Sequence, residues 1–250
     1  MCLISFAFQS HPEFPLILIG NRDEFYARPT ANLHQWENTT IPVYGGRDLK
    51  EGGTWMGMNT QGSFAALTNY RDPAHMADDK PSRGNLLRDF LSGDIPLEEF
   101  HRLLRSRGTA YNGFNIIYGN CEELYYYNNI QQQLRQLYPG IYGLSNAFLD
   151  TPWPKVLKAK DALQRNLHIS NNEDQLIHAF TDISEADDAA LPSTGVSPEW
   201  EKKLSAMFIT SPSYGTRLTT FVSIDNRRNV VYREKGYVPE ADTRFTFNIQ

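Results

Sequence analysis

Cys2 stands directly after the initiator methionine, where a thiol can do chemistry that an internal cysteine cannot. Initiator methionines are removed when the next side chain is small, so we expect residue 2 to carry both a thiol and a free α-amine. An α-amine has an ordinary pKa of about 7.7 to 8.0 and can accept the proton of its own side chain. Cys2 is therefore a candidate nucleophile that needs no catalytic histidine. The alternative is a small apolar residue buried in a strand, because buried free cysteines are common.

The two apolar segments at the start of the chain predict a β-hairpin. Cys2–Phe8 and Phe14–Gly20 are both rich in β-forming residues and are separated by a short polar turn. An antiparallel pairing about that turn places Cys2 opposite Asn21 and Arg22.

A cluster of polar side chains follows the second apolar segment. It consists of Asn21, Arg22, Asp23 and Glu24, which we expect just beyond the end of the strand. A carboxylate beside Cys2 could hold the α-amine, and an arginine could lower the pKa of the thiol. The alternative is a charged strand exit that merely solvates a turn.

The remaining elements indicate the fold class. Strands are predicted at 2–8, 14–20, 54–58, 63–68, 113–118, 123–127, 141–145, 219–224, 229–234 and 243–247, and helices at 82–91, 96–106, 153–167 and 173–180. Strands therefore alternate in blocks with pairs of helices, which favours an α+β layered sandwich over repeated βαβ units. Residues 182–199 are predicted to be a loop.

Composition excludes several classes of protein. The 250 residues carry a net charge of −5 and no basic stripe, so nucleic acid is not an expected partner. Two cysteines are too few for a secreted disulfide scaffold. We find no signal peptide and no segment with the roughly 20 apolar residues that span a membrane. We therefore predict one domain over 1–250, a cytoplasmic location and no transmembrane segment; the oligomeric state stays open.

Several short strings in order give a resemblance that covers essentially the whole chain. They are MCLI at 1–4, IGNRDEFYARP at 19–29, EGGTWMG at 51–57, LTNYR at 67–71, YNGFN at 111–115, YGLSNA at 142–147 and YGTR at 214–217. Together they resemble the NRDE family, also called the transport and Golgi organisation protein 2 family.

This resemblance implies the fold of the N-terminal-nucleophile (Ntn) hydrolases, a four-layer αββα sandwich of mostly antiparallel sheets. The layout is similar to that of bile-salt hydrolases and penicillin V acylases, in which the N-terminal cysteine is followed by an Arg-Asn-x-Asp string. Here the order is different, so Arg22 is the candidate arginine, and Asp23 and Glu24 are alternative holders of the amine.

The same resemblance implies further site residues. Asn69 corresponds to an oxyanion-hole asparagine, Asn146 to a second catalytic asparagine and Arg217 to a late active-site arginine. Each also has a simpler interpretation, because asparagines are common in turns and an arginine can pair with a surface acid.

Gly53 and Trp55 are candidate binding residues. Gly53 follows another glycine and would allow a close backbone approach beside the site, and Trp55 could line an acyl pocket or simply pack in the core. The sequence lacks the pattern of a phosphate-binding loop.

Three functions remain open at this stage. The first is an amide or acyl hydrolase with Cys2 as nucleophile, acting on a small acyl-amide or lipid-like ligand. The second is a non-catalytic lipid- or haem-binding trafficking protein that uses the same pocket. The third, a glutaminase half of an amidotransferase, would need a partner or a further domain. No haem-attachment string or axial pair is present, so we predict neither cofactor nor metal.

Overall fold

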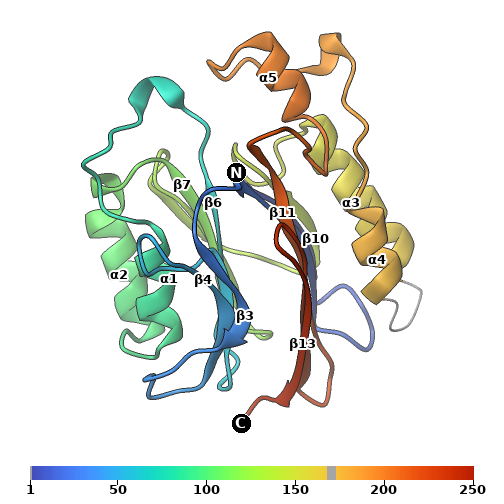
Figure 1. Cartoon of the computed structure of the whole chain (residues 1–250). Coiled ribbons are helices and arrows are strands. Elements are labelled where there is room, and N and C mark those ends of the chain that lie inside the picture. Colours follow the sequence, from blue (N-terminus) through green and yellow to red (C-terminus); the bar gives the residue numbers. More distant parts are fainter. Residues whose placement is uncertain (1, 168–172) are drawn as a thin grey trace.

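Two antiparallel β-sheets lie face to face and carry helices on their outer sides in the computed structural model of the chain (Figure 1). The structure describes residues 2–167 and 173–250. In order across the first sheet, the strands are β10 (Gly140–Leu144), β1 (Cys2–Phe8), β2 (Leu16–Phe25), β11 (Tyr214–Ile224), β12 (Asn229–Tyr237) and β13 (Glu240–Asn248). In order across the second, they are β3 (Thr30–Gln35), β4 (Val43–Asp48), β5 (Met56–Asn59), β6 (Phe64–Asn69), β7 (Phe114–Gly119), β8 (Leu124–Asn128) and β9 (Gln133–Gln136).

Helices cover the outer face of each sheet (Figure 1). The α-helices are α1 (Gly84–Leu91), α2 (Leu97–Arg107), α3 (Pro154–Asn166), α4 (Glu173–Ala179) and α5 (Pro198–Lys203), and short 3₁₀ turns occur at Pro73–His75, Gly108–Ala110 and Asp188–Ala190. α1 and α2 lie against the second sheet, and α3 and α4 against the first.

Three hydrophobic cores separate these layers. Alternate residues of β1 point in opposite directions, so Ile4 and Phe6 pack between the sheets while Leu3 packs under α3 and α4. The third core lies between the second sheet and the helices α1 and α2, around Phe90 and Phe100. The predicted four-layer αββα sandwich is confirmed.

The β1–β2 hairpin forms as predicted and pairs Cys2 with Arg22, one of its two predicted partners, while Asn21 lies opposite Leu3. One expectation about it was wrong, because β2 does not end at Gly20. It continues to Phe25, since β11 pairs along its other side as far as that residue. The polar cluster 21–24 therefore lies inside a strand and is divided between the two faces of the sheet.

Other differences lie where the sequence pattern is weak. β3, β4 and β9 were not predicted; β3 is largely polar, β4 contains two adjacent glycines and β9 is mostly exposed. α5 begins within the predicted loop 182–199, where the Ser197 hydroxyl accepts a hydrogen bond from the amide of Trp200 and Pro198 occupies the first turn.

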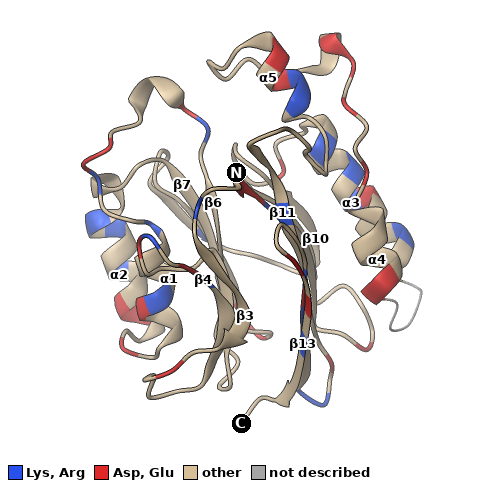
Figure 2. Cartoon of the chain, viewed as in Figure 1, with Lys and Arg blue, Asp and Glu red and all other residues tan. Residues whose placement is uncertain are grey.

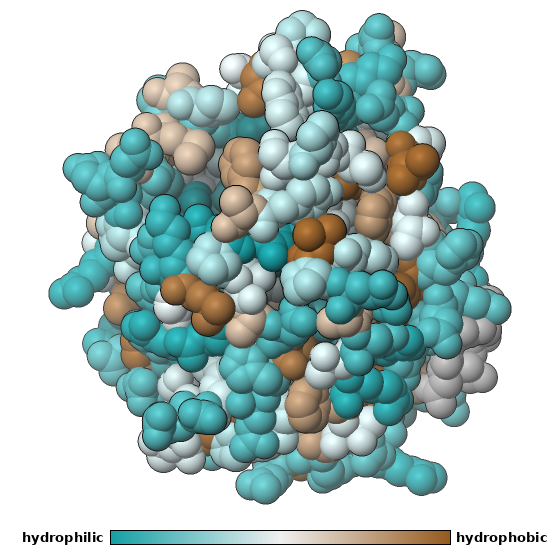
Figure 3. Space-filling view, viewed as in Figure 1, coloured by the Kyte–Doolittle hydropathy of each residue, from teal (hydrophilic) through white to brown (hydrophobic). Residues whose placement is uncertain are grey.

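Charged residues are frequent on the helices and loops, and further ones lie near the start of β1 and β11 (Figure 2). The face shown in Figure 3 is mostly hydrophilic, with apolar side chains scattered over it. Within the described part of the chain, none of the helices has the length and apolar character that a membrane span requires.

Candidate active site

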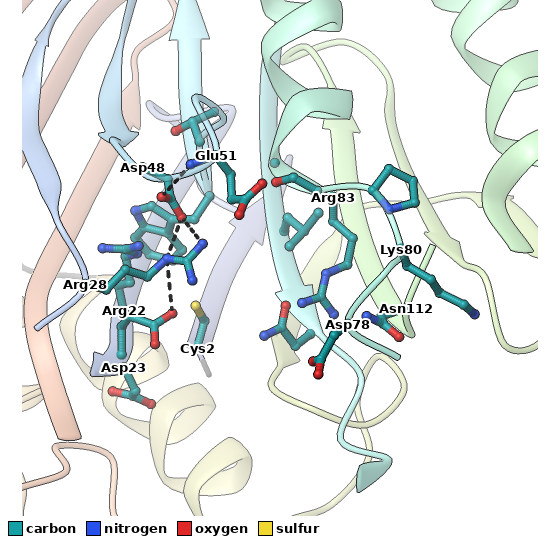
Figure 4. A pocket seen from close by; sticks show the side chains of 18 residues that line it. Cys2, Arg22, Asp23, Arg28, Asp48, Glu51, Asp78, Lys80, Arg83 and Asn112 are labelled. Carbon is teal, nitrogen blue, oxygen red and sulfur yellow. Dashed lines mark hydrogen bonds and ion pairs between the residues drawn. The ribbon is translucent and has the colours of Figure 1, made fainter. Parts of the chain in front are cut away.

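A cavity of about 270 Å³ opens beside Cys2, where the two sheets meet the start of α1. Its lining residues are Cys2, Arg22, Asp23, Glu24, Arg28, Asp48, Glu51, Thr54, Trp55, Leu67, Asn69, Asp78, Lys80, Pro81, Ser82, Arg83, Gly84 and Asn112. Figure 4 shows Arg28 and Asp48 on one side of Cys2, and Arg83 and Lys80 on the other. Half of the lining residues are charged, so the cavity is suited to a small polar ligand.

Cys2 is held on both sides by neighbouring strands. Its backbone pairs with Arg22 of β2, and its carbonyl accepts a hydrogen bond of 3.0 Å from the Ser145 hydroxyl beyond β10. The residue is only 8% exposed, and burial raises the pKa of its thiol. The nearby guanidinium of Arg22 acts in the opposite direction.

The alternation of β2 separates the four polar residues. Arg22 and Glu24 lie on the face toward the second sheet and line the cavity. Asn21 lies on the other face, where its amide donates to the carbonyl oxygens of Phe180 and Met207 at 2.9 and 2.8 Å. The structure therefore places Asn21 outside the cavity, in contact with the helical layer.

Asp23 reaches the edge of the cavity and is 1% exposed. One of its carboxylate oxygens accepts a hydrogen bond of 2.7 Å from the Thr216 hydroxyl. Burial raises the pKa of this carboxyl, and the ammonium group of Lys155 opposes that effect. The two predicted holders of the amine therefore differ in their surroundings. Asp23 is deeply buried. Glu24 lines the cavity and lies 4.0 Å from the guanidinium of Arg28, with which it forms a long ion pair.

The two predicted asparagines lie together but differ in what they face. Asn69, at the end of β6, lines the cavity. Asn146 lies behind it and donates its amide hydrogen to the carbonyl of Asn69 at 2.9 Å, while its own carbonyl accepts from the amide of Arg71 at 2.7 Å. Asn146 therefore fixes the backbone that presents Asn69.

Arg217 and Gly53 also lie outside the cavity lining. The Arg217 guanidinium donates to the carbonyl oxygens of Val238 at 3.1 Å and Phe25 at 3.2 Å, and also to that of Arg28. It thereby fixes the chain that follows β2.

Gly53 makes the close backbone approach expected of it. A Cβ built on Gly53 would lie 2.4 Å from the carbonyl carbon of Gly84, at the start of α1. This contact packs the start of α1 against the segment that leads to Trp55, and Trp55, Arg83 and Gly84 all line the cavity.

Several lining residues were not predicted from the sequence. Arg28 pairs with Asp48 at 2.6 Å, and Arg83 donates to the carbonyl oxygen of Gly113 at 3.0 Å. Burial lowers the pKa of Arg83. Arg28 belongs to the string at 19–29 and could have been chosen on that ground, whereas Arg83 carries no comparable signal.

A group of buried charges lies behind Cys2 and was also missed. Arg71 and Glu201 form an ion pair of 2.9 Å in which both side chains are 4% exposed. Lys155 of α3 is 1% exposed, and burial lowers its pKa to about 8 against the opposing effect of Asp23. The described residues contain no cluster of three or more histidine, cysteine or acidic side chains that could hold a metal ion.

Comparison with solved structures defines the fold class. A variant of the conjugated bile acid hydrolase from Clostridium perfringens superposes with a TM-score of 0.54 over 99% of this chain and 92% of its own, at 12% sequence identity. At this identity the likeness shows the fold alone. The chain has the Ntn hydrolase fold, as predicted.

Comparison of sequences then defines the family. Residues 1–239 match the family model described as Transport and Golgi organisation 2, and the chain belongs to that family. The Transport and Golgi organization protein 2 homolog of Homo sapiens is 34% identical, over 94% of this chain and 93% of its own. The Mus musculus homolog is 32% identical over 99% and 97%, and the Drosophila melanogaster protein is 26% identical over 94% and 92%.

Proposed function

We propose that the protein is an N-terminal cysteine hydrolase that acts on a linear amide or related acyl bond of a small molecule. The observation that carries this proposal is the position of Cys2. Its thiol lines a polar cavity at the first residue of β1, with Asn69 in the same lining and Asp23 at its edge. This is the arrangement that a nucleophile on an Ntn hydrolase fold requires.

The reaction would proceed after removal of Met1. The Cys2 sulfur attacks the carbonyl carbon of the substrate, and the α-amine of the same residue takes the thiol proton. The side-chain amide of Asn69 is placed to donate to the oxyanion of the tetrahedral intermediate. The intermediate then collapses, and the leaving amine departs with the proton held by the α-amine. Water hydrolyses the acyl-cysteine.

The surrounding charges have separate roles in this proposal. Asp23 holds the α-amine of residue 2, and Arg22 favours the thiolate because its guanidinium lines the same cavity and lowers the pKa of the thiol. Arg217 and Asn146 act through the backbone that they hold, at Phe25 and at Asn69.

The alternative of a lipid- or haem-binding protein receives less support from the cavity. Nine of its eighteen lining residues are charged, and no histidine of the described chain is among them. A lipid chain or a haem would be expected to lie against predominantly apolar side chains.

The decisive experiment is covalent labelling followed by intact mass spectrometry. Wild-type protein and the Cys121→Ala control are expected to lose Met1 and to form an adduct at Cys2 with acyl-amide or lactam electrophiles. Cys2→Ala should form none. Retention of Met1 in protein from cells with normal processing, or equal labelling of Cys2→Ala, would refute the proposal.

A further inference from the structure

Lys155 is a buried lysine that the proposed reaction does not use. It lies in the first turn of α3, which packs against β1 and β10, and it is 1% exposed. Its ammonium group has no hydrogen-bond partner among residues 2–167 and 173–250. Lysines are almost never fully buried unless they are paired, so the buried position of Lys155 is unusual.

The charged groups around Lys155 come from several elements. Asp23 of β2, Cys2 of β1, Arg71 beyond β6 and Glu201 of α5 all act on its ammonium group. Arg71 and Glu201 are bonded to each other, so their charges largely cancel. This leaves Asp23 and Cys2 as the other ionisable groups that act on Lys155.

The other neighbours contribute little charge. Tyr214 of β11 lies close to Asp23, and burial raises the pKa of its hydroxyl well above the ordinary value, so it remains neutral. Core residues that pack against α3 from β10 and α4 include the apolar Ile141 and Leu176. Asp150 beyond β10 is bonded to Lys160 further along α3.

We propose that Lys155 is a positioning residue for the nucleophile: its ammonium group supplies, from behind the β1–β2 pair, a positive charge that favours loss of a proton from residue 2. The proposal rests on the proposed function only in treating Cys2 as the nucleophile. Lys155 itself forms no bond to substrate and transfers no proton. The proton lost from residue 2 goes to solvent through the cavity.

The direction of this effect does not depend on which group of residue 2 ionises first. Loss of a proton from the α-ammonium group removes a positive charge near Lys155, and loss from the thiol creates a negative charge there. A neighbouring positive charge favours both changes, because it lowers the pKa of the group that loses the proton. Asp23 has the opposite effect on residue 2, so Lys155 also limits the extent to which Asp23 keeps the ammonium form.

The test measures the ionisation of Cys2 directly, in the full chain and without a substrate. The rate of alkylation by iodoacetamide is followed from pH 5.5 to 9.5, and the modified peptides are mapped so that Cys2 is separated from Cys121. At about pH 6 to 7, below the pKa of about 8 at which Lys155 loses its own charge, alkylation of Cys2 in Lys155→Met should be about tenfold slower than in the wild type. Lys155→Arg keeps the charge and should restore a rate near that of the wild type.

The matched control is Lys160→Met, which removes a half-buried lysine from the same helix but from a site bonded to Asp150. Its alkylation rate at Cys2 in the same pH range should equal that of the wild type. If Lys155→Met does not fold, Lys155→Gln removes the same charge and retains a polar end.

A purely structural lysine would alter stability and leave the alkylation rate of Cys2 at about pH 6 to 7 unchanged. A wild-type rate in the folded, uncharged variant therefore overturns the inference. That result is independent of turnover, because alkylation reports ionisation whether or not Cys2 forms an acyl-enzyme. Failure of the hydrolase proposal would instead appear as absent acylation of an otherwise normally ionising Cys2.

Discussion

Glu234 of β12 gives a quantitative prediction about the link between the two sheets. This carboxyl is 2% exposed and faces the second sheet, where it accepts a hydrogen bond of 2.8 Å from the backbone amide of Leu33 in β3. Arg22 is the positive charge that acts on it. Burial nevertheless raises the pKa of Glu234 from 4.5 to about 7.

The size of the expected stability change follows from the difference between the pKa of Glu234 in the folded chain and its ordinary value. Between pH 4.5 and about 7 the folded chain keeps a proton that the unfolded chain has released, so stability falls as the pH rises through this window. The interval, 7 minus 4.5, corresponds to roughly 3 kcal/mol at about 1.4 kcal/mol per unit. Glu234→Gln keeps the shape and the acceptor oxygen but does not titrate. We therefore expect this variant to be more stable than the wild type by up to roughly 3 kcal/mol at pH 8.

Urea unfolding at pH 5, 6, 7 and 8 measures this difference. The gap between Glu234→Gln and wild type should be small at pH 5 and should grow toward pH 8. Glu240→Gln, on the exposed start of β13, is the matched control and should show no such trend. A gap that is the same at pH 5 and pH 8, or a variant that is less stable at pH 8, would show that Glu234 does not keep its proton in the folded chain.

Two further predictions concern the surroundings of the cavity. Glu201→Gln leaves the charge of Arg71 buried without its carboxylate, so urea unfolding should show a loss of about 3 to 5 kcal/mol. Gly53→Ala places a methyl group 2.4 Å from the backbone of Gly84, and should lower the unfolding free energy by about 1 to 3 kcal/mol and alter alkylation of Cys2. Gly52→Ala meets open space but has a positive φ of 74°, so it should cost about 1 to 2 kcal/mol and leave that alkylation unchanged. Equal alkylation rates in the two glycine variants would contradict the role given to the Gly53 contact.

The parts of the site that depend on local pairing could be predicted from the sequence. The position of the first turn indicated the register of the first hairpin to within one residue, and this placed Asn21 or Arg22 opposite Cys2. The end of β2 could not be predicted in the same way, because it depends on pairing with β11, which is distant in the chain. A polar segment that ends a strand and one that continues it have the same local pattern.

For the other site residues, the direction in which the side chain points could not be predicted from the sequence. Asn146 and Arg217 were expected in the site, but their amide and guanidinium groups contact backbone carbonyls, which only the tertiary structure determines. Lys155 was not expected near the site but lies behind it. It shares its helix with Lys158 and Lys160, and only the packing of the folded chain shows that it alone of the three is buried. The single domain over 1–250 and the cytoplasmic location stay predictions.

The hydrogen bonds between β6 and the end of β10 mean that the site forms only when the two sheets meet. Thr68 donates to the Ser145 carbonyl at 2.6 Å and Asn146 to that of Asn69, so each bond joins one sheet to the other. Cys2 belongs to the first sheet and Asn69 to the second. The constellation therefore exists only once the sheets have docked, and a folding intermediate with separate sheets would expose a thiol of ordinary reactivity. Reactivity at Cys2 therefore reports whether the two sheets have docked.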